Sequence, residues 1–250
     1  MTGDGGPWFE TYFGLDYLRI YRFADTAEQL TLLRGFLAGL PSGAAVLDLP
    51  CGHGRHAAEV AGWGYAVTGL DLQAKLLGVA ERLAAERGVA LTLARGDMRA
   101  FPFADDAFDA AYCLFTSLGY FADDRQHQQV LDEFARVLRP GARYLLDLAN
   151  IDHVRRQPAA KVWEHQGVRV RSEYRWNDTE KRALTRRWAT FPEGREAHYE
   201  SSVRLFEGAE IAAMLAAAGF AVEQTLGSYA GEPLAPERPR RILLCQRLPR

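Results

Sequence analysis

The chain has 250 residues, of which 48% are hydrophobic and 25% are charged, and its formal net charge is -2. This length and composition predict a globular protein with a full core, and they fit one large α/β domain with an insertion better than two independent domains. A net charge so close to zero gives no sequence-wide field that would attract nucleic acid or an anionic membrane. We therefore expect a small-molecule partner, and the oligomeric state stays open.

The first residues and the cysteines bear on the cellular compartment of the protein and on metal binding. The opening "MTGDGGPWFE" lacks a basic stretch followed by an apolar run, and no later segment has the length of an apolar membrane span. The cysteines, Cys51, Cys113 and Cys245, are odd in number and widely scattered, which fits neither a disulfide framework nor a metal site. We expect a cytoplasmic protein that binds no metal.

Two helices are predicted before the first strand. Residues 8–21 carry an interrupted aromatic stripe at helical spacing, and residues 25–40 show a helical pattern in which Thr26 and Gln29 have capping-box spacing. An apolar strand follows, beginning at Val46.

Strand and helix patterns then alternate up to Asn150. Strands are predicted at 65–71, 89–97, 109–115 and 142–150, and helices at 73–88, where Gly88 stops the helix, and at 124–141, where Pro140 and Gly141 end it. Such alternation is typical of a Rossmann-like, doubly wound, mostly parallel sheet with helices on both faces.

The pattern changes to strict alternation after Asn150. In residues 168–176 the side chains of Val168, Val170, Tyr174 and Trp176 fall on one face and charged side chains fall on the other. Further strands are predicted at 184–191 and 198–206, so 151–206 is expected to be a small antiparallel β insertion and a candidate substrate cap. A helix at 207–220 and two last strands return to the core, which comprises 1–150 and 207–250.

The stretch "VLDLPCGHGRHA", residues 46–57, carries the strongest functional pattern. An apolar strand ends in an acid, followed by small residues and by a helix that is predicted to begin near His53. In open α/β folds this arrangement is the general form of a nucleotide-type cofactor site, because the free N–H groups of the helix face the crevice beyond the strand.

Five motifs in the same order make the chain resemble the class I S-adenosylmethionine-dependent methyltransferases that act on small molecules. They are "VLDLPCGHG", "VTGLDLQ", "GDMRAFPF", "FDAAYCLFTSLGYF" and "RVLRPGARYLLDL", and the resemblance covers most of residues 8–150. It implies S-adenosylmethionine as cofactor and methyl transfer to a nitrogen or oxygen of a small molecule. Where the family usually has glycine this chain has Pro50, which keeps its carbonyl but lacks an N–H.

The resemblance also implies that the helices of 8–40 are a possible lid over the cofactor, and it implies roles for particular residues. Gly52 and Gly54 would leave room for the cofactor, Asp48 would order the loop, Asp71 would accept hydrogen bonds from the ribose, and Asp97 would receive the adenine amino group. The remaining cofactor candidates are Leu49, Pro50, Leu72, Met98 and Leu114, with Tyr21 preferred over Tyr12 and Tyr17. Candidates on the acceptor side, just past the ends of the fourth and fifth strands, are Thr116, Ser117, Tyr120, Asn150 and His153. No catalytic base is identified.

Two other functions remain open. The fold could serve as a non-catalytic S-adenosylmethionine-binding module, or the chain could be an NAD-dependent oxidoreductase, although the G-x-G-x-x-G pattern of dinucleotide folds does not occur in the loop. We interpret His53 as a polar loop residue and His56 as a surface helix residue. The arginines of 151–206 are interspersed with acids, which favours a solvated strand face over a nucleic-acid site.

Overall fold

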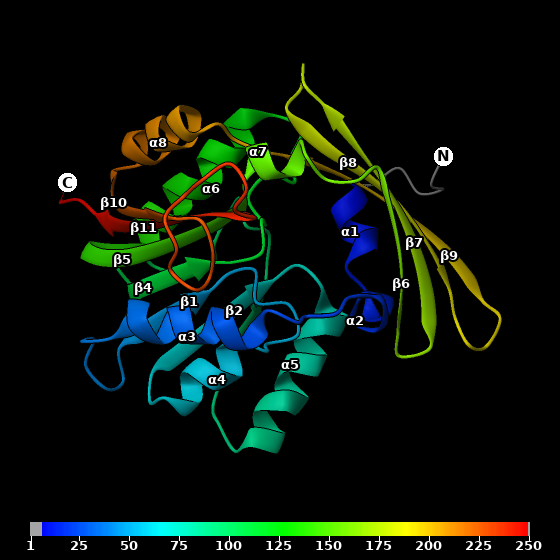
Figure 1. Cartoon of the computed structure of the whole chain (residues 1–250). Helices are drawn as coiled ribbons and strands as arrows, with labels where there is room; N and C mark the ends of the chain where they lie inside the picture. Colours follow the sequence, from blue (N-terminus) through cyan, green and yellow to red (C-terminus); the bar gives the residue numbers. More distant parts are fainter. Residues whose placement is uncertain (1–6, 250) are drawn as a thin grey trace.

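The computed structural model describes residues 7–249, which form two sheets and the helices that pack on them (Figure 1). The helices are α1 (Trp8–Tyr12), α2 (Leu15–Ile20), α3 (Thr26–Leu37), α4 (Ala57–Gly62), α5 (Ala74–Arg87), α6 (Asp124–Val137), α7 (Ile151–Val154) and α8 (Gly208–Ala217). The strands are β1 (Ala45–Asp48), β2 (Ala66–Asp71), β3 (Thr92–Arg95), β4 (Phe108–Cys113), β5 (Leu138–Ala149), β6 (Ala160–His165), β7 (Val168–Asn177), β8 (Arg182–Thr190), β9 (Glu196–Arg204), β10 (Phe220–Leu226) and β11 (Arg240–Arg247). None of the helices within 7–249 is long and apolar enough to span a membrane.

The larger sheet has seven strands in the order β10-β11-β5-β4-β1-β2-β3. Strands β1 to β5 pair in parallel, whereas β11 is antiparallel to β5 and β10 is antiparallel to β11. From β1 the chain proceeds outward to β2 and β3, and it then returns to place β4 on the other side of β1. This reversal creates a crevice beyond the carboxyl ends of β1 and β4, the place where open α/β sheets bind ligands.

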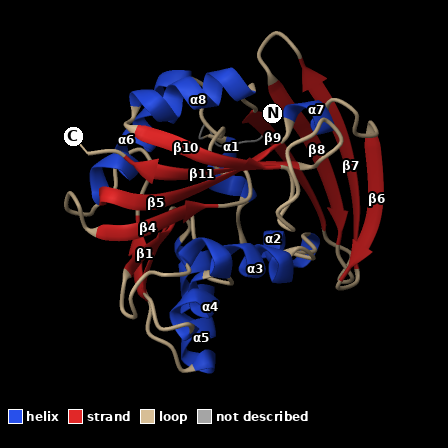
Figure 2. Ribbon diagram, turned by 60° about the vertical axis from the view of Figure 1, so that its left-hand side comes forward, coloured by secondary structure: helices blue, strands red, loops and turns tan. Residues whose placement is uncertain are grey.

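Side chains of the central strands alternate between two hydrophobic cores. Leu47 of β1 and Leu146 of β5 lie in the core that includes α6 and α8, while Val46 and Leu145 lie in the core that includes α3 and α4. Figure 2 shows these helix pairs on opposite faces of the sheet. Because both faces are covered, the strands have continuous apolar sequences. The predicted α/β fold with helices on both faces is confirmed.

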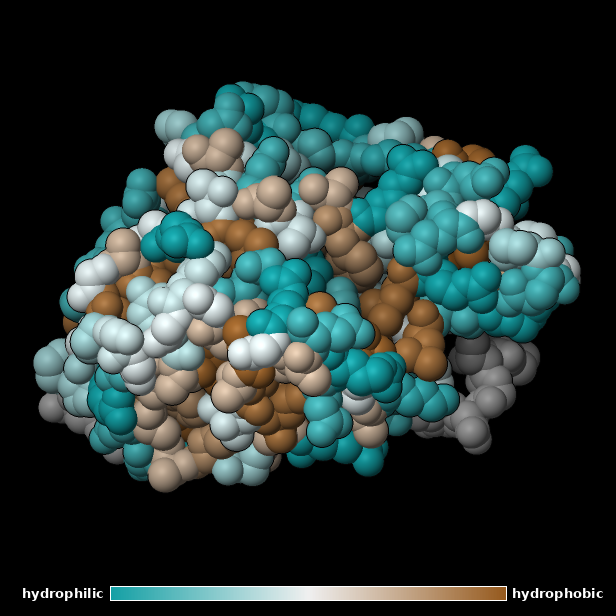
Figure 3. Space-filling model, turned by 90° about the horizontal axis from the view of Figure 1, so that it is seen from below, coloured by the Kyte–Doolittle hydropathy of each residue, from teal (hydrophilic) through white to brown (hydrophobic). Residues whose placement is uncertain are grey.

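The smaller sheet, β6-β7-β8-β9, is antiparallel throughout and lies against α1 and α2 (Figure 1). Its inner face packs Val168 and Val170 against Ile20 of α2, and the indole N–H of Trp163 donates to the Ile20 carbonyl at 3.0 Å. The outer face of β7 is exposed at Arg169 and Arg171. Seen from below, apolar residues reach the surface between the core and this largely hydrophilic sheet (Figure 3).

Several sequence-based boundaries were wrong. Three helices precede β1 rather than two, because Gly14 separates α1 from α2. Thr26 and Gln29 form no capping box: the Thr26 hydroxyl donates to the Phe23 carbonyl, and Gln29 is buried in contact with later residues. A capping box is formed instead by Glu207 and Glu210 at the start of α8.

Three further differences follow from local geometry. Helix α4 begins at Ala57 and not near His53, because Gly52 and Gly54 adopt positive φ values of 54° and 76°. Helix α6 ends at Val137, and Leu138 is already paired with β4. The segment 151–206 contains α7 and a fourth strand, β6, which was not predicted.

Candidate functional site

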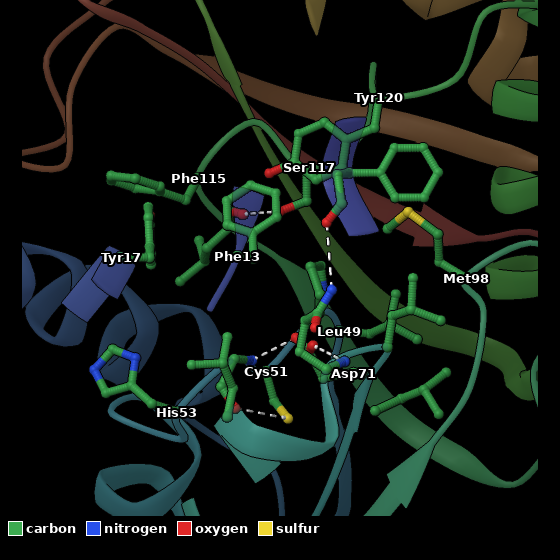
Figure 4. Close-up of a pocket in the computed structure, with 18 of the residues that line it drawn as sticks. Phe13, Tyr17, Leu49, Cys51, His53, Asp71, Met98, Phe115, Ser117 and Tyr120 are labelled. Carbon is green, nitrogen blue, oxygen red and sulfur yellow. Dashed lines mark hydrogen bonds between the residues drawn. The ribbon is translucent and has the colours of Figure 1, made fainter. Parts of the chain in front are cut away.

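A first cavity lies in the crevice beyond β1, β2 and β4 (Figure 4). Its walls come from the loop after β1, the loop after β2, residues 96–98, the loop after β4, and aromatic side chains of α1 and α2. The predicted cofactor residues that line it are Leu49, Pro50, Gly52, Asp71, Leu72, Asp97, Met98 and Leu114. Segments that are far apart in the sequence therefore meet at this edge of the sheet, as the motif order implied.

The loop after β1 is held by backbone hydrogen bonds. Cys51 N–H donates to the Leu70 carbonyl at 2.9 Å, and Gly54 N–H donates to the Cys51 carbonyl at 2.9 Å. At Gly52 a Cβ atom would meet nothing within 4 Å, so the space next to this residue is open to a ligand. At Gly54 a Cβ atom would lie 2.7 Å from the Cβ of Ala80. Gly54 thus permits close packing against α5 and is not among the lining residues of the cavity.

Asp71 connects the loop to the end of β2. Its carboxylate accepts from Gly52 N–H and from Gln73 N–H, both at 2.8 Å, and the side chain is buried at the cavity wall. Burial raises the pKa of Asp71, against the lowering effect of these hydrogen bonds. Each carboxylate oxygen has a second lone pair, so Asp71 can also accept from a bound ligand.

Asp48 does not line the cavity but lies beneath it, 2% exposed. Burial raises the pKa of Asp48 to about 8, so the carboxyl group is largely protonated at neutral pH. Its Oδ2 atom makes no hydrogen bond of good geometry within the described part of the chain. Asp48 is the last residue of β1, directly before the loop, and its role in ordering the loop stays a prediction.

The opposite wall combines an acid with apolar side chains. Asp97 accepts from the guanidinium of Arg99 at 2.6 to 3.2 Å and from Arg99 N–H at 2.8 Å. Burial acts to raise the pKa of Asp97, but these bonds from Arg99 lower it overall. Leu72 and Met98 lie beside Asp97 and give this part of the cavity an apolar surface.

Aromatic residues of α1 and α2 close the mouth of the first cavity. Phe9, Phe13 and Tyr17 line it, and the ring of Phe13 lies 5.1 Å from Tyr17 and 5.4 Å from Tyr120. Tyr21, the preferred cofactor contact of the sequence analysis, lies outside this cavity, with its ring 5.1 Å from Tyr17. Tyr17 lines the first cavity, whereas Tyr21 follows the end of α2 at Ile20 and has an extended backbone.

A second cavity of about 630 Å³ lies between the core, α1, α2 and the inner face of the smaller sheet. The two cavities share four aromatic residues, Phe13, Tyr17, Phe115 and Tyr120. Of the predicted acceptor residues, Thr116 and His153 line the second cavity, Ser117 lines the first, and Tyr120 lines both. The wall between the cavities is therefore one aromatic side chain thick.

Asn150 was predicted on the acceptor side, but its side chain instead forms hydrogen bonds with the backbone of the protein. Its amide donates to the carbonyls of Ala235 and Arg238, both at 2.9 Å, and its oxygen accepts from Asp152 N–H at the start of α7. The side chain is 1% exposed. Both hydrogens of its amide are thus used by the protein itself, and Asn150 lines neither cavity.

The loop after β4 is fixed by a buried ion pair. Asp147, fully buried, accepts from Arg240 Nε at 2.7 Å, from Phe115 N–H at 2.8 Å and from the Tyr229 hydroxyl at 2.7 Å. Arg240 also donates to the Thr116 hydroxyl at 2.9 Å. Phe115 and Thr116 have φ values of 68° and 61°, an unfavourable conformation for these residue types that the network around Asp147 maintains.

Arg55 is a site residue that sequence reasoning missed. It lines the first cavity, donates to the Thr26 hydroxyl and to Gln29, and stacks over Phe23 at 4.9 Å. Among the residues that the structure describes, it forms no ion pair with a carboxylate. In the sequence Arg55 is a single arginine within a turn. Its spacing from other residues does not indicate a functional role.

Of the two histidines beside Arg55, His53 is a partly buried loop residue and His56 is buried more deeply than predicted. His53 lines the first cavity, and His56, interpreted as a surface residue, is 6% exposed and bonds Gln29 at 2.8 Å. Burial lowers the pKa of His53 to about 4 and also lowers that of His56, with a smaller contribution from Arg55. Both imidazoles are therefore neutral at pH 7.

A family model described as "Methyltransferase domain" matches residues 46–141. An uncharacterised protein of Mycobacterium tuberculosis (strain ATCC 25618 / H37Rv) is 38% identical over 105 residues, which are 42% of this chain and 36% of that protein. The dTDP-3-amino-3,6-dideoxy-alpha-D-glucopyranose N,N-dimethyltransferase of Streptomyces fradiae is 33% identical over 127 residues, which are 51% of this chain and 45% of the enzyme. The chain thus spans less than half of the length of these curated relatives.

Solved structures resemble the chain over nearly its whole length. An S-adenosylmethionine-dependent methyltransferase from Clostridium acetobutylicum ATCC 824 has a TM-score of 0.82 at 16% identity, covering 96% of this chain and 100% of its own. A sugar N-methyltransferase from Streptoalloteichus sp ATCC 53650 has a TM-score of 0.73 at 24% identity, covering 100% and 96%. At these identities the likeness establishes the fold, including the part of the chain that the family model does not reach.

Proposed function

Residues 46–141 belong to the methyltransferase domain family, and on that premise we propose that the protein transfers a methyl group from S-adenosylmethionine to an amine of a small molecule. One observation carries the proposal. The first cavity has the loop and acids of a nucleotide-type cofactor site, and it shares an aromatic wall with a second, larger cavity. Two adjoining cavities provide what group transfer needs, since donor and acceptor must meet while water is kept out.

The residues of the first cavity fit the cofactor. The open space at Gly52 admits it close to the backbone, and the buried carboxylate of Asp71 can accept from ribose hydroxyls. Leu72 and Met98 offer apolar contact to the adenine ring. Arg55, which has no carboxylate partner among the described residues, would hold the carboxylate of the methionine moiety. When bound, the cofactor supplies a methyl group on a positively charged sulfur, so the donor is already activated.

The aromatic mouth of the first cavity supports a lid function for α1 and α2. The cavity encloses about 130 Å³ in this structure, less than the roughly 300 Å³ at the lower end of ligand sites. A cofactor of nucleoside size therefore requires Phe9, Phe13 and Tyr17 to move outward on entry. Their return would exclude water during transfer.

The second cavity favours an amine acceptor. His153 is not free to act as a base there, because Nδ1 lies 2.9 Å from the Glu237 carbonyl, which it must donate to, and Nε2 is engaged by the Gln157 amide. An amine needs no base if it arrives neutral, whereas a hydroxyl acceptor is better served by one. The basic side chains of Lys161, Arg175 and Arg187 around the cavity would lower the pKa of an amine bound within it and so favour its neutral form. The named N-methyltransferases among the relatives agree with this acceptor type.

In this proposal the residues of the shared wall orient the reactants and exclude water. Phe115 is held by the Asp147 network, and Tyr120 stacks with Phe13, so the wall keeps its shape without contact from a ligand. Alignment of donor and acceptor can contribute a large part of the rate enhancement in such a displacement.

The test is transfer of label from methyl-labelled S-adenosylmethionine to a panel of matched pairs of small molecules that differ only in an amine or a hydroxyl group. We expect label to appear on at least one amine and more slowly on its hydroxyl partner. A folded protein that saturates with cofactor but labels no compound in the panel would be a binding module. Faster labelling of the hydroxyl partners would overturn the assignment of an amine acceptor.

A further inference from the structure

Arg187 on β8 is a buried cation at the wall of the second cavity. The residue is 5% exposed, its Nε donates to the Ser172 hydroxyl at 2.8 Å, and Nη1 donates to the Tyr12 hydroxyl. Its guanidinium lies 5.7 Å from the ring centre of Tyr12, 5.6 Å from that of Tyr21 and 5.3 Å from that of Trp163. Aromatic faces and hydroxyl groups therefore surround the positive charge.

No negative charge of the protein compensates this cation. Among residues 7–249 no carboxylate lies within ion-pair distance of Arg187, and its hydrogen-bond partners, Ser172, Tyr12 and Tyr174, offer hydroxyl groups. Burial is the largest effect that raises the pKa of Tyr12 to about 12, so this phenol is not ionised at neutral pH. A guanidinium carries five N–H donors, so the bonds to Ser172, Tyr12 and Tyr174 leave two donors for a ligand.

The surroundings of Arg187 in the second cavity are also positive. Arg155, Lys161, Arg175 and Arg240 line the same cavity, and Asp25 is the lining residue of opposite sign. Arg155 and Arg240 have carboxylate partners. Lys161 donates to the Gln157 amide oxygen at 2.7 Å and has, within the described chain, no ion pair. The uncompensated charge of the cavity is therefore concentrated on β6, β7 and β8.

We propose that Arg187 binds an anionic group of the methyl acceptor, either a carboxylate or a phosphate ester. The inference rests on the proposed function, because it assigns the second cavity to the acceptor. A buried charge without a partner costs stability, and an apolar residue of similar volume would avoid that cost. A guanidinium with free donors at a cavity wall binds planar or tetrahedral oxyanions well.

The placement of Arg187 also defines which acceptors fit. The ring of Tyr21 lies between the two ends of the cavity, 5.6 Å from Arg187 and 5.2 Å from the ring centre of Phe115. Phe115 belongs to the wall shared with the cofactor. The anionic end of the acceptor thus lies one aromatic ring away from the reacting end, so Arg187 selects molecules that carry amine and anion at that separation.

The experiment is calorimetric titration of the protein, saturated with S-adenosylhomocysteine in low-salt buffer, with inorganic phosphate, inorganic pyrophosphate and acetate. We compare wild type with Arg187→Met, Arg187→Lys and the control Arg186→Met. Arg186 is the neighbour on β8, exposed on the outer face and paired with Glu200 at 3.1 Å. The phosphate and acetate titrations distinguish the two sources of the anion.

We expect wild type to bind at least one of these anions saturably, Arg187→Met to weaken that binding at least tenfold, and Arg186→Met to change it less than twofold. Arg187→Lys keeps the charge but loses the planar fork, so binding should weaken by a smaller factor. If Arg187→Met does not fold, the titrations of wild type and of Arg187→Lys still test whether Arg187 binds the anion. Once an acceptor is known, Arg187→Met should raise KM at least tenfold and change kcat much less.

Absence of saturable anion binding by wild type, or equal binding by Arg187→Met, would overturn the inference. The titration with S-adenosylhomocysteine that precedes each run separates this failure from failure of the proposed function. If wild type binds S-adenosylhomocysteine and no anion, the anionic acceptor is wrong while the cofactor assignment stands. If it binds anions and no S-adenosylhomocysteine, the methyltransferase proposal is wrong.

Discussion

The two sheets of the molecule differ in how their faces are covered, and they contribute different parts of the site. Strands of the seven-stranded sheet are covered on both faces, and its ligand crevice follows from strand order and loop geometry. The four-stranded sheet is covered on one face only, and its contribution depends on which side chains point inward. Backbone topology thus creates the first cavity, whereas individual side chains determine the chemistry of the second.

Both cavities contain one substantially buried arginine without a carboxylate partner in the described chain, Arg55 in the first and Arg187 in the second. Asp71 and Asp97 line the first cavity, whereas basic residues predominate in the second. This difference suits a cofactor with a positively charged sulfur on one side and an anionic acceptor on the other.

The largest expected effect concerns the backbone of the first cavity. Gly52→Val places a side chain in the open space beside the loop, so we expect S-adenosylhomocysteine affinity to fall at least 100-fold, about 2.7 kcal/mol. Calorimetric titration measures this loss of affinity. Transfer of labelled methyl groups to the acceptor should decrease together with the affinity.

The control for this change is Gly194→Val in the turn between β8 and β9. Gly194 also has a positive φ, 79° against 54° at Gly52, and open space at the Cβ position, so valine is strained at both positions. We expect a similar loss of thermal stability in both variants but unchanged cofactor affinity in Gly194→Val. Equal loss of affinity in the two would show that strain, and not the open space at Gly52, explains the result.

The second prediction concerns Asp48 beneath the loop. Burial raises its folded-state pKa to about 8, above the unfolded value, so the folded state holds a proton that the unfolded state has released between about pH 4 and pH 8. Its contribution to stability is present at low pH and is lost as pH rises through the folded pKa. Between pH 6 and pH 9 wild type should lose about 2.7 kcal/mol from this group, most of it below pH 8.

Asp48→Asn removes that titration and should flatten this part of the pH dependence. Denaturant unfolding of both proteins at pH 6, 7, 8 and 9 measures it, and Asp123→Asn, at an exposed N-cap, serves as the control. A difference between Asp48→Asn and wild type that is the same at every pH would contradict the raised pKa.

The third prediction separates the two cavities. Thr185 lies on the inner face of β8 between Tyr174 and Ser201 and lines the second cavity. Thr185→Trp should fill part of this space and lower kcat/KM for the acceptor about tenfold, roughly 1.4 kcal/mol, with cofactor affinity unchanged. Arg186→Trp, on the outer face of the same strand, should alter neither. Loss of cofactor affinity in Thr185→Trp would mean that the cavities are not functionally distinct.

The smallest expected effect concerns Arg55. Arg55→Met should weaken S-adenosylmethionine about fivefold, roughly 1 kcal/mol, because the cofactor carboxylate loses a partner that is partly open to solvent. Adenosine, which lacks that carboxylate, should bind wild type and the variant equally, and its titration is the matched control. A similar weakening of adenosine binding would place Arg55 elsewhere in the site.

The sequence predicted those parts of the fold that depend on local pattern. The apolar run before Asp48, the stop at Gly88 and the strand ending in Asp71 were found because strand burial and left-handed glycine caps leave a direct pattern. The acids at strand ends meet in one cavity because parallel strands end at one edge of the sheet.

What the sequence did not show depends on contacts between distant segments. His56 looked exposed because α4 was started too early, and its burial comes from Gln29 in α3. In "LTRRWATF" the period of two indicates that either Arg186 or Arg187 points inward, but not which. Arg187 is in phase with Ala183, Thr185 and Ala189, and these small or half-polar residues are the one signal that could have identified the inner face.

The central claim, that the crevice at β1 and β4 is a site for S-adenosylmethionine, is tested most directly by calorimetric titration of wild type with S-adenosylhomocysteine and with NAD. We expect saturable binding of S-adenosylhomocysteine with one molecule per chain, abolished in Gly52→Val, and no saturable heat with NAD. No heat with S-adenosylhomocysteine or S-adenosylmethionine, together with saturable binding of NAD, would contradict the account.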